Sequence, residues 1–401
     1  MSVVLRIASM LLILIIFVIH VSSDDDDVLR DDVRKRAQDV RMMLRNGAAT
    51  SVDDVLQTYL KVFEDEKQHE CDACLIAAIQ KTLNRCDVAL SFFKNCDAER
   101  CYDLIQFDVD KMQIHSSHCF EIIGRHDLAL PILSNVLIRH IEKKEQINDM
   151  MVRLIVQRIV LVRRALGKPS SSTEAFFRHA IRTLRLPYET SYQIPLEYDI
   201  MFQNAVPWHD VQSNRIAMIL EENADQILKE FEKALCDEIA FDFGFDRDLV
   251  KGKSKDGWGK YNLMRNGIWN SKRCVETFPF VCSLLRDAPE LSNLFEGEVA
   301  FLKLKRGVNL LPHFGPTNSR LTVHLGLMTP FEGVRLRVGN ETRRQVALKS
   351  LVFDDSFEHE VTWDDENTPA ENQEACHKCN SEGSRYILSL HMHNRHRNLF
   401  S

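Results

Sequence analysis

The sequence predicts an α+β fold in which an all-helical N-terminal region precedes a sandwich or jelly roll of short strands flanked by helices. Apolar residues recur at helical spacing from about Asp31 to Pro187. From Glu298 onward they alternate with period two between turns rich in Gly, Pro, Asn and Asp. With 401 residues, 45% of them hydrophobic and 27% charged, the chain has room for two or three globular domains.

Residues 1–23 have the pattern of a secretory targeting segment. Arg6 precedes an apolar run from Ile7 to Val18, and the small residues Val21-Ser22-Ser23 precede four aspartates. The run is shorter than the about 20 apolar residues of a bilayer span, which favours a signal peptide cleaved near Ser23. An uncleaved signal anchor is the alternative. Either segment predicts that the rest of the chain lies in the endoplasmic reticulum lumen or secretory pathway, soluble or signal-anchored.

Residues 24–200 are predicted to form a cysteine-containing helical domain. Between Arg153 and Arg164, arginines are interleaved with apolar residues, which predicts solvated arginines on a half-buried helix. The net charge of −7 likewise argues against a nucleic-acid partner. No clean 34-residue repeat is visible, so a helical-repeat array stays an alternative to a simple scaffold. The expected helices are Asp32–Asn46, Ser51–Glu66, Asp127–Leu166 and one that Ser171-x-x-Glu174 opens with a capping box.

Eleven cysteines fit an oxidising compartment. Six of them lie between Cys71 and Cys119, an even number that allows three disulfides in several pairings. Cys236 is left over and is expected to be a buried free thiol. Two local disulfides are candidates, Cys274 with Cys282 and Cys376 with Cys379. Zinc is the alternative for Cys71-x-x-Cys74 with His115 and His118, and for Cys376-His377-Lys378-Cys379.

Residues 201–401 are predicted to form the strand-rich domain. Prolines between Pro187 and Pro207 mark its beginning, and Val211–Leu235 is an amphipathic helix. The final His391-Met392-His393-Asn394-Arg395-His396 is expected to be a solvated tail. The expected strands are Glu298–Lys305, Arg320–Met328, Val334–Val338, Lys349–Asp354, His359–Trp363 and Arg385–His393.

Three histidines and one arginine in this domain suit a non-haem iron oxygenase. His313, His324 and His359 lie in or beside apolar strand segments, and Arg385 follows them. Neutral imidazoles bind Fe(II), and a guanidinium pairs with a dicarboxylate co-substrate. The usual iron triad has a carboxylate two residues after its first histidine, but this chain has Gly315 there. That glycine either argues against iron or is typical of one particular family.

The flanking residues favour a particular family. Two segments closely resemble the aspartyl/asparaginyl β-hydroxylases. They are Pro312-His313-x-Gly315-Pro316-Thr317-Asn318-x-Arg320-Leu321-x-x-His324-Leu325-Gly326-Leu327 and Val352-Phe353-Asp354-Asp355-Ser356-Phe357-Glu358-His359-Glu360-Val361. The resemblance covers roughly Trp208 to Arg385. It implies a double-stranded β-helix (jelly-roll) domain and an Fe(II)- and 2-oxoglutarate-dependent dioxygenase of the secretory lumen.

By resemblance, His313 and His359 are the two iron ligands, in a family that has a glycine in place of the third. Arg385 is expected to bind the distal carboxylate of 2-oxoglutarate, His324 the carboxylate nearer the iron. Arg320 and Asp355 match positions that face the peptide substrate, and no catalytic residue is implied beyond the metal and co-substrate ligands. The family also has a local disulfide like Cys274–Cys282 and a glycosylation sequon like Asn340-Glu341-Thr342.

Two departures from the family affect the co-substrate. Thr322 replaces an arginine that contacts it, and Leu302 replaces a serine that helps to hold it. An acidic insertion, Asp364–Ser384, also separates His359 from Arg385. The leading hypothesis is a dioxygenase that hydroxylates the β-carbon of Asp or Asn in EGF-like domains of secreted or membrane proteins. The alternatives are a related dioxygenase acting on lipid acyl chains and an inactive binding or scaffold protein with a decayed co-substrate pocket. A membrane is expected as a partner only if the N-terminal segment stays uncleaved.

Overall fold

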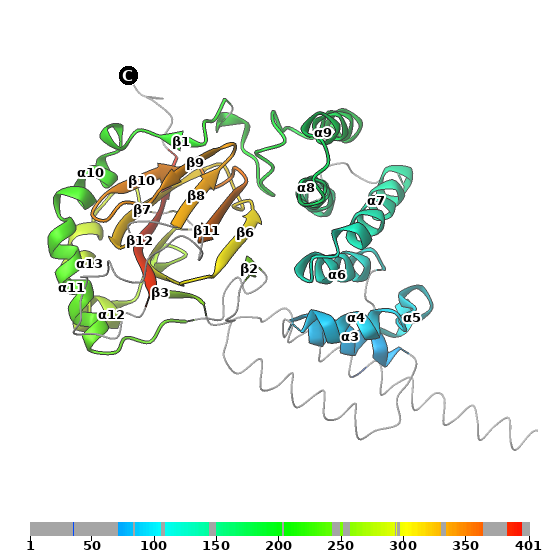
Figure 1. The fold of residues 1–401 in the computed structure, drawn as a ribbon, viewed down its shortest axis with the longest axis horizontal. Helices are drawn as coiled ribbons and strands as arrows, with labels where there is room; N and C mark the ends of the chain where they lie inside the picture. The colour runs from blue at the N-terminus through cyan, green and yellow to red at the C-terminus, as the bar shows by residue number, and fades with distance from the viewer. Residues whose placement is uncertain are drawn as a thin grey trace, which may run out of the picture. The chain divides into compact units, whose positions relative to one another are not determined.

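A computed structural model describes residues 35, 71–82, 85–105, 109–143, 150–202, 204–242, 249–251, 257–292, 294, 297–329, 334–363 and 383–394 (Figure 1). The targeting segment, the helix Ser51–Glu66 and the Cys376/Cys379 pair lie outside these residues, as does all of Asp32–Asn46 except Lys35. Among the described helices, none combines the length and apolar character that a membrane span needs.

The chain divides into two compact units, residues 1–142 and 143–401. The predicted domain boundaries at residues 23/24 and 200/201 stay predictions. The described elements of the first unit are the helices α3 (Asp72–Thr82), α4 (Cys86–Phe93), α5 (Ala98–Ile105), α6 (Val109–Ile122) and α7 (His126–Lys143).

Three disulfides link the first-unit helices, namely Cys71–Cys101, Cys74–Cys96 and Cys86–Cys119. They exclude the zinc alternative for Cys71 and Cys74, because a disulfide sulfur no longer offers a thiolate. Ala89 and Leu90 of α4 pack with Cys86 and Cys119 into a small buried cluster. Disulfides and a small core together hold these short helices.

Two helices open the second unit, α8 (Met150–Ala165) and α9 (Ser170–Leu184). The predicted helix Asp127–Leu166 is therefore two helices, α7 and α8. The capping-box prediction was wrong: α9 begins one residue earlier, with Pro169 as its N-cap and no side-chain cap. Proline suits a helix start because the first N–H groups have no intrahelical partner.

Twelve described strands form two antiparallel sheets. The larger has the order β1-β10-β7-β12-β5-β3-β4 and the smaller β2-β6-β11-β8-β9. The strands are β1 (Trp208–His209), β2 (Val250–Lys251), β3 (Trp258–Arg265), β4 (Ile268–Trp269), β5 (Glu298–Lys305), β6 (Asn309–His313), β7 (Arg320–Met328), β8 (Val334–Val338), β9 (Glu341–Arg344), β10 (Ser350–Phe353), β11 (His359–Trp363) and β12 (Ser384–His393).

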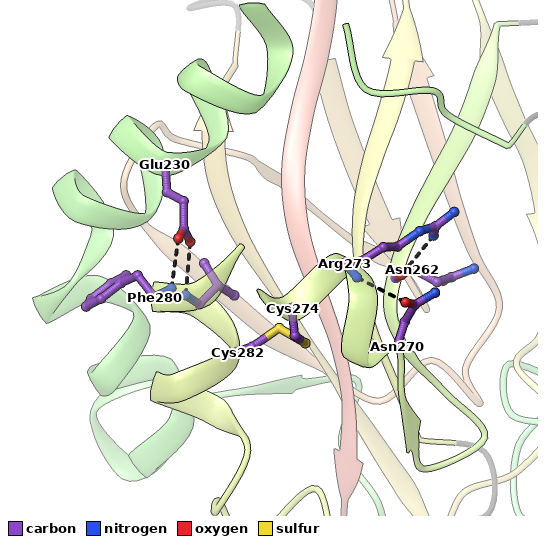
Figure 2. The surroundings of a disulfide bond; sticks show 8 residues. Glu230, Asn262, Asn270, Arg273, Cys274, Phe280 and Cys282 are labelled. Atoms are coloured by element: carbon purple, nitrogen blue, oxygen red, sulfur yellow. Dashed lines mark hydrogen bonds between the residues drawn. A yellow bond between two sulfur atoms is a disulfide. The ribbon is translucent and has the colours of Figure 1, made fainter. Parts of the chain in front are cut away.

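Four helices, α10 (Arg215–Glu222), α11 (Ala224–Cys236), α12 (Ser271–Glu276) and α13 (Pro279–Leu285), cover one face of the larger sheet (Figure 1). The predicted helix Val211–Leu235 is broken at Asn223, between α10 and α11. The Cys274–Cys282 disulfide joins α12 to α13, and Glu230 of α11 accepts hydrogen bonds from the first free N–H groups of α13 (Figure 2). Such a carboxylate stabilises a helix N-terminus.

The alternating pattern of β7 gives the sheet two different faces. Leu321, Val323, Leu325 and Leu327 pack against the helices, as their shared parity predicted. A second core lies between the two sheets and includes Leu302, Leu336 and Val361, among other apolar residues. Thr322 and His324 face this inter-sheet side, where they line a pocket.

Three further expectations were wrong. Cys236 is exposed and disulfide-bonded rather than a buried free thiol. Arg153 and Arg164 are not simply solvated, since each donates a hydrogen bond to another segment of the second unit. His391 and His393 belong to β12 rather than to a solvated tail.

Candidate metal and co-substrate site

His313 and His359 are brought together by strand pairing in the smaller sheet. His313 ends β6, and His359 begins β11. The two residues are direct partners in the antiparallel register. Their ring centroids are 4.1 Å apart. Two residues 46 positions apart in the sequence thus present adjacent imidazoles to the inter-sheet pocket.

Each ring is oriented by a hydrogen bond to its own strand. His313 Nδ1 lies 2.7 Å from the Leu311 carbonyl oxygen, and His359 Nδ1 lies 2.9 Å from that of Phe357. A carbonyl accepts only, so Nδ1 carries the proton and Nε2 carries the lone pair, the tautomer that a metal requires. Burial, followed by the neighbouring His313, lowers the pKa of His359 to about 3, which keeps its ring neutral at pH 7.

The position of the missing carboxylate is filled. A Cβ on Gly315 would lie 2.6 Å from Asp355 Oδ2 and 2.8 Å from the Asp355 carbonyl oxygen. The Gly315 N–H donates to that same carbonyl. Asp355 is in turn bound by Arg320 through Nη2–Oδ2 at 2.6 Å and Nε–Oδ1 at 3.3 Å. Burial alone would raise the pKa of Asp355, but the Arg320 guanidinium holds it well below its usual range. A side chain at position 315 would displace this buried ion pair.

Arg385 provides a buried cation at another part of the same pocket. It is 2% exposed, and its Nε and Nη2 have no hydrogen-bond partner among the described residues. Burial lowers its pKa to about 10, so it stays charged at pH 7. A buried guanidinium with two unsatisfied nitrogens is costly unless an anion binds it. Such a site fits a carboxylate.

His324 offers a second unsatisfied donor or acceptor. Its Nδ1 is buried without a partner in the described residues, and its ring lies edge-on to Phe353 with centroids 4.9 Å apart. Burial, followed by the charge of Arg385, lowers its pKa well below the usual value. The ring of Phe353 also lies 6.0 Å from that of His359. His324 lies on β7 of the larger sheet, and Phe353 is near both its ring and that of His359.

The pocket that these residues line has a volume of about 260 Å³. Its apolar wall includes Leu302, Leu310, Leu336 and Val361. This volume is slightly below the roughly 300–1,000 Å³ of pockets for drug-sized ligands. It suits a small dicarboxylate and one substrate side chain.

The pocket also has three polar residues that sequence reasoning missed, Lys260, Glu298 and His391. Lys260 Nζ lies 3.3 Å from Glu298 Oε1. His391 shares strand parity with Arg385, and this signal could have placed it on the pocket side of β12. Lys260 and Glu298 lie on strands β3 and β5, and neither had a motif of its own.

Among the other predicted site residues that the structure describes, one lines the pocket and the rest lie elsewhere. Thr322 lines the pocket, and its buried Oγ1 has no partner in the described residues. Asn340 is exposed in the two-residue turn between β8 and β9. Cys274 and Cys282 form a disulfide, whereas Cys376 and Cys379 lie outside the described residues.

The donor set fits a metal held by two histidines rather than three or more protein side chains. In the part of the chain that the structure describes, no group of three His, Cys, Asp or Glu side chains is arranged to hold a metal ion. The remaining coordination positions would fall to small molecules, as in a catalytic site with open positions. Unsatisfied nitrogens on Arg385 and His324 could bind the two ends of a chelating dicarboxylate.

Residues 221–369 match the sequence model of aspartyl/asparaginyl β-hydroxylases. Over this segment the chain is similar to that family. It contains both histidines of the candidate metal site, Gly315 and Asp355, whereas Arg385 lies beyond it. The roles of all these residues stay predictions.

Named members of the family and related proteins match over parts of their length. The human aspartyl/asparaginyl β-hydroxylase is 41% identical over 113 residues, which are 28% of this chain and 15% of that protein. The human aspartate β-hydroxylase domain-containing protein 2 is 31% identical over 155 residues, 38% of this chain and 39% of that protein. An ornithine lipid ester-linked acyl 2-hydroxylase of Rhizobium tropici is 27% identical over 159 residues, 39% of this chain and 54% of that protein. The chain thus spans less than two thirds of each relative.

Among solved structures, a prolyl-4-hydroxylase of Pseudomonas putida aligns with a TM-score of 0.24 and 12% identity. The alignment covers 48% of this chain and 91% of that one.

Proposed function

We propose that this chain is an Fe(II)- and 2-oxoglutarate-dependent dioxygenase that hydroxylates the β-carbon of Asp or Asn in EGF-like domains. The observation that carries the proposal is the register-paired His313 and His359, with Nδ1 of each ring held by a carbonyl, in one pocket with Arg385. Two oriented imidazoles and a buried unsatisfied guanidinium match the needs of iron and a dicarboxylate. The two sheets that enclose the pocket are proposed to be a jelly roll.

Iron and 2-oxoglutarate together would activate O₂, which yields succinate, CO₂ and one hydroxyl group on the substrate. The residues of the chain would do the rest. His313 and His359 hold the metal, while Arg385 and His324 orient the co-substrate. The apolar wall with Leu302 and Leu310 excludes water from the reacting centre.

The secretory lumen is proposed as the compartment. The disulfides of both units fit an oxidising environment. The exposed Asn340 of the Asn-Glu-Thr sequon is accessible for glycosylation.

Two alternative functions have an observation each in their favour. Leu302 and Thr322 replace two residues that, by resemblance to the family, would contact the co-substrate beside Arg385 and His324. Loss of these two contacts favours an inactive binding protein. The acyl 2-hydroxylase relative favours a lipid substrate. The charged pair Lys260–Glu298 in the pocket argues against an acyl chain, because burying it beside a hydrocarbon would cost its remaining hydration.

The test is iron binding combined with succinate formation from 2-oxoglutarate in the presence of an EGF-like domain. We expect one Fe(II) per chain, and we expect His313→Ala and His359→Ala each to lower iron affinity by at least about tenfold, because each removes one of two protein ligands. His179→Ala, on the exposed face of α9, is the matched control and should change neither readout. Iron binding without succinate from peptide or lipid would favour the binding protein. Absence of iron binding would contradict the proposal.

A further inference from the structure

Thr322, His391 and Glu298 form one row across the larger sheet. Thr322 of β7 and His391 of β12 are direct register partners. On the other side of β12, the pairing of Leu390 with Val299 places Glu298 of β5 next in the same row. All three residues line the inter-sheet pocket, together with Lys260.

The row lies at the end of the pocket away from Arg385. Along β12, six residues separate Arg385 from His391, or roughly 20 Å of extended strand. Along β7, Thr322 lies between His324 and Arg320. The side chain of Glu298 is 14% exposed, whereas Thr322 and Arg385 are each 2% exposed, so the row is open at Glu298 and buried at Thr322. Under the proposed function, the buried Arg385 end takes the co-substrate, so the row lies where the substrate side chain enters.

The charges at this end are already balanced. Lys260 pairs with Glu298, and Arg320 pairs with Asp355. Burial, followed by the charge of Arg320, lowers the pKa of His391 to about 4, so its ring is neutral at pH 7. Thr322 stands where the family has an arginine and adds no charge. A substrate carboxylate would therefore meet Glu298 without a spare cation to offset the repulsion.

A carboxamide matches the same groups. Its N–H₂ group donates two hydrogen bonds, and the Glu298 carboxylate accepts them. Its oxygen accepts one, which the Thr322 hydroxyl, buried and unpartnered in the described part of the chain, can donate. The His391 ring can donate or accept. We infer that Thr322, His391 and Glu298 form a substrate subsite that selects asparagine over aspartate, an inference that rests on the proposed function.

The test compares two versions of one EGF-like domain that differ only in Asn or Asp at the acceptor position. Binding to the full chain is measured by isothermal titration calorimetry with 2-oxoglutarate and without added iron, so that no turnover occurs. We expect the Asn domain to bind at least about tenfold more tightly, since a carboxylate leaves the buried polar groups mispaired. With iron, kcat/KM for hydroxylation should follow the same order.

Two variants identify the residues responsible. Glu298→Gln keeps a hydrogen-bond acceptor but frees the charge of Lys260, so the Asp domain should bind about tenfold more tightly while the Asn domain changes by less than about threefold. Thr322→Arg adds a cation to the row and should shift the preference in the same direction. Glu222→Gln, at an exposed position on α10, is the control and should leave both affinities unchanged.

Equal binding of the two domains to the unaltered protein would overturn the inference, even if both are hydroxylated. An unchanged preference in both folded variants, with folding checked by thermal melting, would also overturn it. If the Asn domain binds preferentially but neither domain is hydroxylated, the subsite stands and the proposed function fails.

Discussion

Gly315 shows how one residue can decide the chemistry of a site. The carboxylate that a three-ligand iron site would have there cannot be added, because the space belongs to the Asp355 side chain and carbonyl. Asp355 is fixed by two hydrogen bonds from Arg320. The glycine was visible in the sequence, but the ion pair that makes it necessary was not. Arg320 and Asp355 were expected to face the substrate, and their pairing with each other is a tertiary feature.

The same acidic segment contains a carboxyl group with the opposite behaviour. Asp354 is fully buried, and its neighbours are Gln193 Nε2 at 3.3 Å and the Ser356 N–H at 2.9 Å. Burial raises the pKa of Asp354 to about 8, against the lowering effect of its hydrogen bonds with Ser356. Asp354 is therefore protonated at pH 7, whereas the adjacent Asp355 is charged.

Asp354→Asn should remove a pH dependence of stability. Because the folded-state pKa is raised, the folded protein binds more protons than the unfolded chain between about pH 4 and 8. This contribution is fully present below the unfolded pKa and is lost as pH rises toward 8. The variant should therefore gain stability relative to the unaltered protein by on the order of 3 kcal/mol between pH 5 and pH 8. The measurement is urea unfolding at several pH values.

Asp287→Asn, at an exposed position, is the control and should give a difference that does not vary with pH. A stability difference for Asp354→Asn that is flat from pH 5 to 8, or that falls with pH, would contradict the assignment of a protonated Asp354.

At the scale of elements, one carboxylate joins α8 to the start of strand β11, which contains the candidate metal ligand His359. Glu358, directly before His359, is 3% exposed in its side chain and pairs with Arg164 of α8 and Arg337 of β8. Arg164 also donates to the Ser191 carbonyl and stacks over the ring of Tyr192. Arg164, which was expected to be solvated, thus helps to hold the position of a candidate iron ligand.

Glu358→Gln should weaken both folding and iron binding. Loss of the buried charge removes the carboxylate partner of Arg164 and leaves Arg337 paired with Glu360 alone, and breaking a buried ion pair typically costs about 3–5 kcal/mol. His359 then loses a support of its backbone position, so Fe(II) affinity should fall by about 10–100-fold. Glu360→Gln is the matched control on the other side of His359, because Glu360 is 24% exposed and pairs with Arg337 nearer the surface. Equal effects of the two variants in urea unfolding and iron titration would contradict this role for Glu358.

Several strands begin and end where the sequence predicts them. Glu298–Lys305, Arg320–Met328, Val334–Val338 and His359–Trp363 begin and end as strands at the expected residues. Trp258–Arg265 and Asn309–His313 were missed. In the first strand, side chains on both faces are buried, so its residues show no clear period of two. The second strand contains a proline, and most of its residues are only partly buried. The helix break at Asn223 was missed because α10 ends there without a glycine or proline in the sequence to mark it.

At the scale of the whole molecule, the sequence predicted a helical half and a strand-rich half from the change in period alone. The sequence could not predict that the boundary between the two compact units lies between Glu142 and Lys143, because α8 and α9 have the same helical period as the first-unit helices. What assigns them to the second unit is long-range pairing such as Arg164 with Glu358. The pairing of the cysteines was equally hidden, since spacing does not select among the possible disulfides.

The distribution of disulfides predicts how each unit responds when one is removed. Cys86–Cys119 closes 33 residues of the first unit, whereas Cys274–Cys282 closes 8 residues of the second. In the chain-entropy model these loops correspond to about 3–4 and 2–3 kcal/mol of stabilisation. The first-unit disulfide also completes the small cluster with Ala89 and Leu90, so its removal disrupts the packing between α4 and α6.

We therefore expect the double variant Cys86→Ser/Cys119→Ser to raise amide hydrogen exchange in α4 and α6 while Fe(II) binding at His313 and His359 is retained. The double variant Cys274→Ser/Cys282→Ser should instead raise exchange in α12 and α13, whose residues pack on the face of the larger sheet opposite the pocket. Hydrogen-exchange mass spectrometry and iron titration on the same samples separate the two effects. Loss of iron binding in the first double variant would show that the metal site depends on the first unit, which would contradict a site built by the second unit alone.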